Sequence, residues 1–284
     1  MIASLPRPAW LRAATVLYVA AFLIFLFLPL VTVAVFAFND APYPAPPWRG
    51  FTLDWFFGNE EGGRVGLFHD PELLGSIWTS VIVSVCVTAL SLAVGTANAF
   101  LMERHTFPGK QVLSVLILTP LVIPGVILGI SILSLSSRVA DLMDALFGLD
   151  LELLRPGLPL VVLGQFSYVA TIATLIVSAR LKRFDRTLEE AALNLGASHA
   201  AVLRTITFPY LRPAMLGAAA ISFLMSFENF NTTLMLVGAD PPLTILMYGR
   251  MREGASPVLN AVSLFLMLAS AAFALSLMRG AAKK

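Results

Sequence analysis

The sequence has little charge and almost no cysteine. Of its 284 residues, 13% are charged and 58% are hydrophobic, whereas soluble domains average about 25% charged and about 45–50% apolar residues. The single cysteine, Cys86, excludes a disulfide scaffold and a multi-cysteine metal site. A mean hydropathy of +0.84 excludes intrinsic disorder. The composition therefore predicts an integral membrane protein.

Several functional motifs are also missing. The net charge of +2 and the pI of about 8.8 are too weak to indicate a nucleic-acid partner. No Walker A, HExxH or GxSxG motif occurs. The three histidines, His69, His105 and His199, are far apart in the sequence, which does not favour a metal cluster. We therefore expect no catalytic residue, no metal site and no cofactor bound by this chain.

Long apolar runs are what the sequence does contain. A bilayer core about 30 Å thick needs about 20 apolar helical residues per crossing. Six segments meet this requirement: residues 13–38, 75–101, 112–136, 158–179, 214–238 and 258–278. The first follows Arg7 and Arg12, but it is much longer than the apolar core of about 7–15 residues in a cleavable signal peptide. We predict an all-α membrane protein with six spans in one domain over residues 1–284.

The distribution of positive charge predicts the orientation. With the amino terminus inside, 13 of the 19 Lys and Arg residues lie in inside segments, so the positive-inside rule places both termini in the cytoplasm. Contact of these loops with anionic lipid also explains the basic pI. The longest outside loop, residues 39–74, is rich in aromatics such as Trp48 and Trp55, which favour the membrane interface. The alternative role for these aromatic residues is contact with an external partner. In the second outside loop, a short helix is expected near residues 139–147.

The longest inside segment, residues 180–212, predicts two short helices. Thr187 and Glu190 have the spacing of a capping box that begins the first helix, and Gly196 ends it. Ser198 is the expected cap of a second helix over residues 200–207, which Pro209 is expected to end.

The first of these helices carries a narrow apolar stripe. Its members fall at i, i+3, i+4 and i+7: Leu188, Ala191, Ala192 and Leu195. A two-turn helix is unstable alone in water, so the stripe must pack against something. It fits a groove on another protein, or it packs beneath the chain's own membrane helices, and the periodicity leaves both open.

The same loop resembles the EAA loop of ABC-importer permeases. That family's pattern is Glu-Ala-Ala, three residues, Gly, nine residues, Ile, any residue, Leu and Pro. This chain matches it with Glu190, Ala191, Ala192, Gly196, Ile206 and Pro209, and Phe208 replaces the Leu. The resemblance implies a type I ABC importer permease fold. It also implies that residues 188–195 form the coupling helix, seated in a cleft of a nucleotide-binding subunit.

The partners follow from this resemblance. It implies two ATP-binding subunits that carry ATP and Mg, so that this chain is the non-catalytic part of the transporter. It also implies a second permease subunit, with a different chain as the preferred choice, and an extracytoplasmic solute-binding protein. The expected location is the bacterial inner membrane.

Other segments resemble the spermidine/putrescine group of these permeases. They are Gly50, Phe51, Thr52 and Leu53 with Trp55, Phe107 with Gly109, and the run from Pro120 to Gly125. This resemblance implies a polyamine or related cationic amine as substrate. Opines, amino-acid derivatives and ferric ion are the alternatives within the same family. In the 120–125 run and at Gly129, we expect a helix bend or close helix packing, with gating as the less favoured role.

The predicted fifth span contains a carboxylate. Burying Glu228 in a bilayer costs about 2.5–3.5 kcal/mol, so it is expected to face the protein interior. We predict a substrate pathway of Glu228, Asn229 and Asn231. Such permeases often carry two adjacent acids at the first two of these positions, and here Asn229 replaces the second acid. The alternative is a protonated or internally bonded Glu228 that holds helices together, helped by polar residues such as Asn98 and Gln165.

Two rival classes explain less of the sequence. A self-sufficient secondary transporter would use Glu228 as a proton or cation site, but it leaves the 180–212 loop unexplained. A membrane-embedded enzyme would require a nucleophile and base, or metal ligands, within the spans.

Overall fold

The computed structural model describes the backbone of residues 8–282 and the side chains of residues 8–272. Both chain ends, with Arg7, Lys283 and Lys284, lie outside the described residues. Over the described range every named element is a helix, and the extended backbone forms one isolated bridge, between Asn39 and Phe51. The predicted all-α fold class is confirmed.

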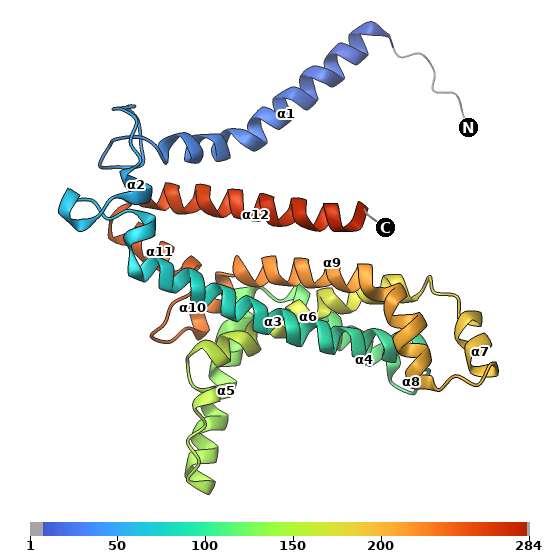
Figure 1. Cartoon of the computed structure of the whole chain (residues 1–284). Helices are drawn as coiled ribbons and strands as arrows, with labels where there is room; N and C mark the ends of the chain where they lie inside the picture. Colours follow the sequence, from blue (N-terminus) through green and yellow to red (C-terminus); the bar gives the residue numbers. More distant parts are fainter. Residues whose placement is uncertain (1–7, 283–284) are drawn as a thin grey trace. The chain divides into compact units, whose positions relative to one another are not determined.

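The chain folds into two compact units, of which the first comprises the residues up to Leu74 and from Gly249 onward. Its helices are α1 (Ala9–Phe36), α2 (Asp54–Phe57), η1 (Glu60–Gly62), η2 (Leu67–His69) and α12 (Val258–Ala282) (Figure 1). The aromatic loop between α1 and η2 folds on itself. Trp55 is buried, its Nε1 donates to the Asn39 carbonyl at 2.8 Å, and the Arg64 guanidinium lies 4.9 Å from its ring centroid. Trp55 therefore stabilises the loop itself, while Trp48 is half exposed and available to the membrane interface.

An ion cluster joins two helices at the edge of this unit. Asp70 precedes α3 (Pro71–Arg104), and its carboxylate accepts the Leu73 N–H at 3.0 Å. Arg250, near the end of α11 (Leu243–Gly254), donates to the same carboxylate at 2.5 and 3.1 Å and to Glu72 at 2.5 Å. Burial raises the pKa of Asp70, but the hydrogen bonds from Arg250 and Leu73 outweigh it, and the pKa lies below the ordinary 3.8. The sequence analysis did not predict this cluster, because Arg250 is 180 residues from Asp70 in the sequence.

The second unit, residues 75–248, is built around α6. Its elements after α3 are α4 (Lys110–Val122), α5 (Gly125–Phe147), η3 (Glu152–Leu154), α6 (Leu158–Leu181), α7 (Thr187–Asn194), α8 (His199–Val202), η4 (Leu203–Thr207), α9 (Phe208–Phe227), α10 (Asn231–Leu236) and most of α11. α6 packs against α4, α9 and α10, and buried apolar clusters join it to α3 and α9. Gly95 permits the close approach of α3, because a Cβ there would lie 2.7 Å from the Cβ of Ala173.

Five described helical segments are long and apolar enough to cross a bilayer: Ala9–Phe36, Pro71–Arg104, Gly125–Phe147, Leu158–Leu181 and His199–Phe227. The span predicted at residues 112–136 is instead divided into α4 and α5. Ile123 has extended backbone at ψ 128°, the conformation that a following proline favours, and Pro124 precedes α5. α5 also includes the short helix predicted at residues 139–147. The predicted last span coincides with α12, whose described side chains end at Ala272.

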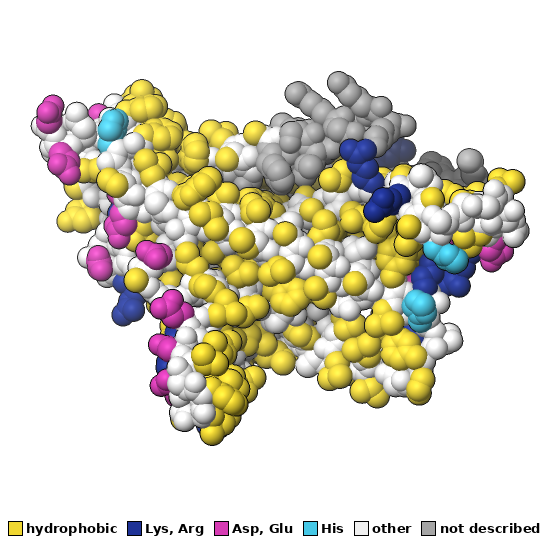
Figure 2. Space-filling view, turned by 60° about the horizontal axis from the view of Figure 1, so that its bottom comes forward, with side chains coloured by type: hydrophobic (Ala, Val, Ile, Leu, Met, Phe, Trp, Pro, Cys, Tyr) yellow, Lys and Arg dark blue, Asp and Glu magenta, His cyan; other side chains and the backbone are white. Residues whose placement is uncertain are grey.

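The surfaces of the long helices are apolar. α1 buries none of its residues, and Leu17 and Phe25 are 73% and 78% exposed. Apolar side chains are spread widely over the face seen in Figure 2, among backbone and polar groups. Water does not favour an apolar surface of this extent, whereas lipid does.

Candidate functional site

The 180–212 loop folds into α7 and α8 at the start of α9, the end opposite α10 (Figure 1). The predicted capping box is wrong. The N–H and the Oγ1 of Thr187 both donate to Oδ1 of Asp185, at 3.0 and 2.8 Å, so Asp185 supplies the cap and Thr187 is the first residue of the helix. These two hydrogen bonds lower the pKa of Asp185. Glu190 is exposed and does not reach back to the helix start.

The end of α7 agrees with the sequence prediction. Gly196 has a φ of +89°, and the Ala197 N–H donates to the Ala192 carbonyl at 3.1 Å. This is the hydrogen bond of a Schellman cap, which favours glycine at the left-handed position. Ser198 caps the next helix as predicted, with its side chain accepting the Ala201 N–H at 3.2 Å.

Pro209 does not end that second helix, so this prediction is wrong. α8 continues through the π-helical turn η4 into α9, and Thr207 and Phe208 both have helical backbone angles. Proline in a helix lacks a donor and its ring clashes with the carbonyl four residues earlier. The wider π turn changes that local geometry, which we take as the reason why the helix accommodates Pro209 in the first turn of α9.

The apolar stripe of α7 faces away from the rest of the chain. Leu188 is 52% exposed and Leu195 is 89% exposed. Ala191 is also exposed, and only Ala192 is partly covered. The interpretation in which the stripe packs beneath the chain's own helices therefore does not hold for three of its four members.

The side of α7 that packs against the rest of the chain is attached through Glu189, which the sequence analysis missed. Its Oε1 accepts a hydrogen bond from Nη2 of Arg104 at 3.0 Å and another from Oγ1 of Thr207 at 2.5 Å. The side chains of Glu189 and Arg104 are only 19% and 13% exposed. Glu189 flanks the apolar stripe beside a second glutamate, Glu190, and no sequence signal distinguishes the two, because the partners of Glu189 are distant in the sequence.

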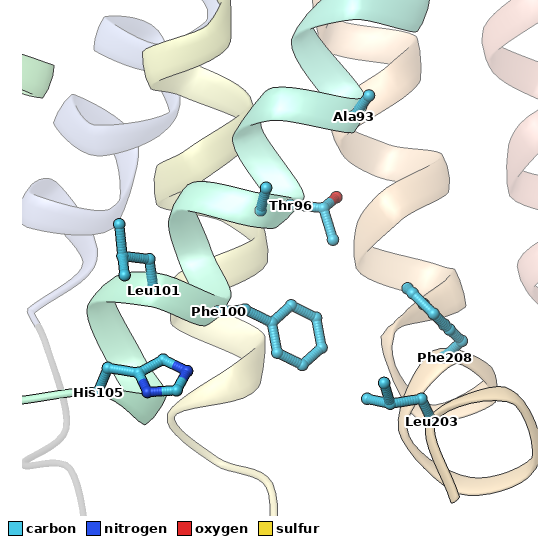
Figure 3. A pocket seen from close by; sticks show the side chains of 8 residues that line it. Ala93, Thr96, Phe100, Leu101, His105, Leu203 and Phe208 are labelled. Atoms are coloured by element: carbon cyan, nitrogen blue, oxygen red, sulfur yellow. The ribbon is translucent and has the colours of Figure 1, made fainter. Parts of the chain in front are cut away.

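A hollow of about 470 Å³ lies between the end of α3 and the start of α9. Figure 3 shows Phe100 of α3 facing Leu203 and Phe208 across it. The rings of Phe100 and Phe208 contact each other edge to face, with their centroids 6.2 Å apart. Of the two remaining loop residues in the family pattern, Ile206 packs against the buried cluster beside α9, and Pro209 is exposed.

The predicted substrate residues lie at a break in the helix, within the stretch predicted as the fifth span. α9 ends at Phe227 and α10 begins at Asn231. Glu228 occupies the C-cap of α9, where its charge acts on Tyr168, and the carboxylate is exposed. Asn231 is exposed as well. Among the described residues, neither side chain forms a hydrogen bond or an ion pair with the other groups.

Asn229 differs from both, because its side chain is used within the chain. Its Nδ2 donates to Oη of Tyr168 at 2.7 Å, and its Oδ1 accepts from N and Oγ1 of Thr233 at 3.1 and 2.7 Å. The Asn229 carbonyl accepts from Thr244 Oγ1 at 3.0 Å. The structure therefore gives Asn229 the role of holding the break between α9 and α10.

Gln165 of α6 extends this network into the buried core. Its Nε2 donates to Oγ1 of Thr233 at 2.8 Å, and its Oε1 accepts from Oγ of Ser226. Gln165 is 1% exposed, so the helix-holding role considered for it agrees with the structure. On the other side of α10, a Cβ on Gly129 would lie 2.9 Å from the Cβ of Met235, which supports the expected close helix packing.

The family of the chain follows from its match to a family model. Residues 95–282 match the model for the binding-protein-dependent transport system inner membrane component. The chain belongs to this family. It is therefore a permease subunit of an ABC importer in the inner membrane, in a family whose members are the non-catalytic transport subunits, and the family predicted from the sequence is confirmed.

Individual relatives agree with this assignment. The chain is 26% identical over 241 residues to the putrescine transport system permease protein PotI of Escherichia coli K12, covering 84% of this chain and 80% of PotI. It is 25% identical over 249 residues to the spermidine/putrescine permease PotC of Haemophilus influenzae, covering 87% and 88%. A bacterial ABC transporter that imports the acidic polysaccharide alginate has a chain of similar fold, with a TM-score of 0.74, 17% identity and 96% coverage of both chains. The expected type I importer permease fold is thus confirmed.

Proposed function

We propose that this permease carries a polyamine or a related small cationic amine into the cell. The observation that supports this most directly is the exposed carboxylate of Glu228 at the carboxyl end of α9. The negative end of a helix dipole favours a cation, and so does the carboxylate. Half-helix ends at interrupted spans are common cation sites in transporters. The similarity to PotI and PotC, whose names specify putrescine and spermidine, supports the same substrate class.

Charge outside the membrane agrees with a cationic substrate. In the predicted topology, the outside loops hold 12 of the 17 carboxylates but only six of the 19 Lys and Arg residues. A surface of one sign raises the local concentration of oppositely charged solutes and the rate at which they arrive. Glu228 then attracts the cationic substrate at the end of α9, and Asn231 offers it a hydrogen bond. Asn229 holds the backbone between these two residues.

The energy source in this proposal is ATP hydrolysis in separate subunits. α7 is the coupling helix, and the exposed side chains Leu188, Ala191 and Leu195 enter a cleft of an ATP-binding subunit. Two such subunits hold ATP and Mg, a second permease completes the pathway, and an extracytoplasmic binding protein delivers the solute. The exposed stripe favours this arrangement over a self-sufficient secondary transporter, which would have no use for it.

The experiment is to purify the tagged chain with its operon partners and reconstitute the complex in liposomes. Putrescine or spermidine, supplied with the binding protein, should stimulate vanadate-sensitive ATPase activity and be imported. Stimulation only by other solutes would overturn the substrate class. The absence of any co-purifying ATPase would overturn the mechanism.

Glu228→Gln tests the site itself. Loss of a charged hydrogen-bond acceptor should raise the KM for the amine about tenfold, with little change in kcat. Asp240→Asn removes the same charge from an exposed bend and controls for the overall acidity of the outside loops; its KM should change less than about twofold. An unchanged KM in Glu228→Gln would remove Glu228 from the pathway.

A further inference from the structure

One carboxylate joins three separate elements of the second unit. Glu189 lies in the first turn of α7, Arg104 is the last residue of α3, and Thr207 is the last residue of η4, directly before α9. The same Oε1 of Glu189 accepts from both partners, at 3.0 Å from Arg104 and 2.5 Å from Thr207. We name Glu189, Arg104 and Thr207 the three-helix clamp.

Each charge of the clamp lies where its helix favours it. Glu189 is at the amino end of α7, and Arg104 is at the carboxyl end of α3, so both helix dipoles stabilise the pair. The Arg104 guanidinium also lies 5.3 Å from the ring centroid of the buried Phe184. Thr207 is fully buried, which keeps its hydroxyl from exchanging Glu189 for water. The clamp is therefore a fixed, largely dry contact rather than a mobile surface ion pair.

We propose that Glu189 is the positioning residue through which displacement of α7 reaches α3 and α9. This inference rests on the proposed coupling role of α7. A partner that holds the exposed Leu188 and Leu195 pushes or pulls on α7 from outside. Glu189 is on the inner side, where the motion passes to the ends of two long helices. Without this contact, the non-helical segments on either side of α7 take up the motion.

The surroundings of the clamp permit movement of those helix ends. The hollow of about 470 Å³ separates α3 from η4 and the start of α9 next to the clamp, and its lining is mostly apolar. Phe100 and Phe208 make an edge-to-face contact across it (Figure 3). The burial of apolar surface is not directional, so the apolar lining of the hollow tolerates sliding, whereas the hydrogen bonds of Glu189 define which element moves with α7.

The test compares clamp variants in the reconstituted full importer. Glu189→Gln removes the charge, Arg104→Met removes its partner but keeps an apolar stem over Phe184, and Thr207→Val removes the buried hydroxyl with almost no change of shape. The readout is the coupling ratio, defined as ATP hydrolysed per solute molecule imported. We expect each single change to raise this ratio about fivefold to tenfold, and the Glu189→Gln/Arg104→Met double variant to be no worse than either single one, because both break one contact.

A matched control separates the clamp from a general effect of charge. Glu103→Gln makes the same change at a side chain of similar exposure, 18%, whose partner is the exposed Lys182 at 3.5 Å. Its coupling ratio should stay within about twofold of the wild type. Thr207→Val keeps the test possible if the charge variants do not insert.

The outcomes distinguish this inference from the proposed function. Normal co-purification of the ATPase subunit with a raised coupling ratio supports the clamp. An unchanged ratio in all three variants, or additive effects in the double variant, overturns it while the import mechanism stands. Loss of the ATPase subunit from the clamp variants also overturns it, because Glu189 would then serve docking rather than transmission. If the wild-type chain brings no ATPase with it, the proposed function has failed.

Discussion

The two ends of α9 differ in which groups the chain leaves without a partner. At the start of α9, the inner face of α7 is bonded through Glu189, while Leu188 and Leu195 remain exposed. At the other end, both polar atoms of the Asn229 side chain are bonded inside the chain, while Glu228 is exposed. The contrast teaches that polarity or position in a span does not identify a functional residue. At the break between α9 and α10, Asn229 is used by the fold and is structural, whereas Glu228 is left open and is available to a substrate.

The largest effect is expected from breaking the open face of α7. In the reconstituted importer, Leu188→Asp with Leu195→Asp should reduce co-purification of the ATPase subunit by about 100-fold or more. Each leucine buried in an interface contributes about 1.5–3 kcal/mol. Because both side chains are exposed in this chain, its own thermal unfolding should be unchanged. The measurement is the ratio of the two subunits after affinity purification in mild detergent.

Asn194→Asp is the control for this double variant. Asn194 is exposed on the same helix but outside the apolar stripe, so the added charge should leave the subunit ratio within about twofold. Full retention of the ATPase subunit by the leucine double variant would contradict the proposal that the exposed stripe of α7 binds that subunit.

A smaller effect is expected from the closed network at the other end. Gln165→Leu keeps most of the side-chain volume but leaves the buried Ser226 hydroxyl without its acceptor and removes one of the two hydrogen bonds of the Thr233 hydroxyl, which keeps its bond to Asn229. Unsatisfied buried groups cost about 1–3 kcal/mol each, so the thermal midpoint of the purified chain should fall by several degrees. Asn231→Leu changes an exposed amide next to the network and should leave the midpoint almost unchanged. Equal midpoints for the two variants would contradict the division between bonded and open groups.

Local sequence patterns predicted the parts of α7 that depend on local geometry. Gly196 ends the helix because only its immediate neighbours determine the cap, and the spacing of Leu188 and Leu195 gave a face that the structure shows exposed. The role of Glu189 could not be predicted in this way. Its partners Arg104 and Thr207 are 85 and 18 residues away, and no local periodicity reports such contacts.

The two helix breaks make the same point. The break before α5 contains Pro124, which is visible in the sequence, although the predicted span ran through it. The break at residues 228–230 contains neither proline nor glycine. It is held by contacts such as that between Asn229 and Tyr168, which are 61 residues apart. A hydropathy window therefore predicts a continuous span where tertiary hydrogen bonds stabilise an interruption that presents Glu228.

The smallest effect tests a bonded charge in the first unit, at Asp70. The pKa of Asp70 lies below 3.8 in the folded chain because Arg250 and the Leu73 N–H bond its charged form. A lowered carboxyl pKa stabilises the fold above the unfolded pKa, about 3.9, and this contribution is lost as the pH falls through the folded value. The hydrogen bond to Asp70 raises the pKa of Arg250 further above its ordinary, already strongly basic value, so Arg250 stays charged over this range of pH and adds no titration of its own. Asp70→Asn should therefore lower the free energy of unfolding by about 1–2 kcal/mol at pH 7, measured by thermal unfolding. The gap in stability between the variant and the wild type should close below about pH 4.

Glu72→Gln is the control for Asp70→Asn. The Glu72 side chain is 63% exposed, so this variant should show a much smaller gap in stability. A gap in Asp70→Asn that stays constant between pH 7 and pH 3 would mean that packing or the helix cap, which asparagine retains, determines the difference rather than the charge held by Arg250.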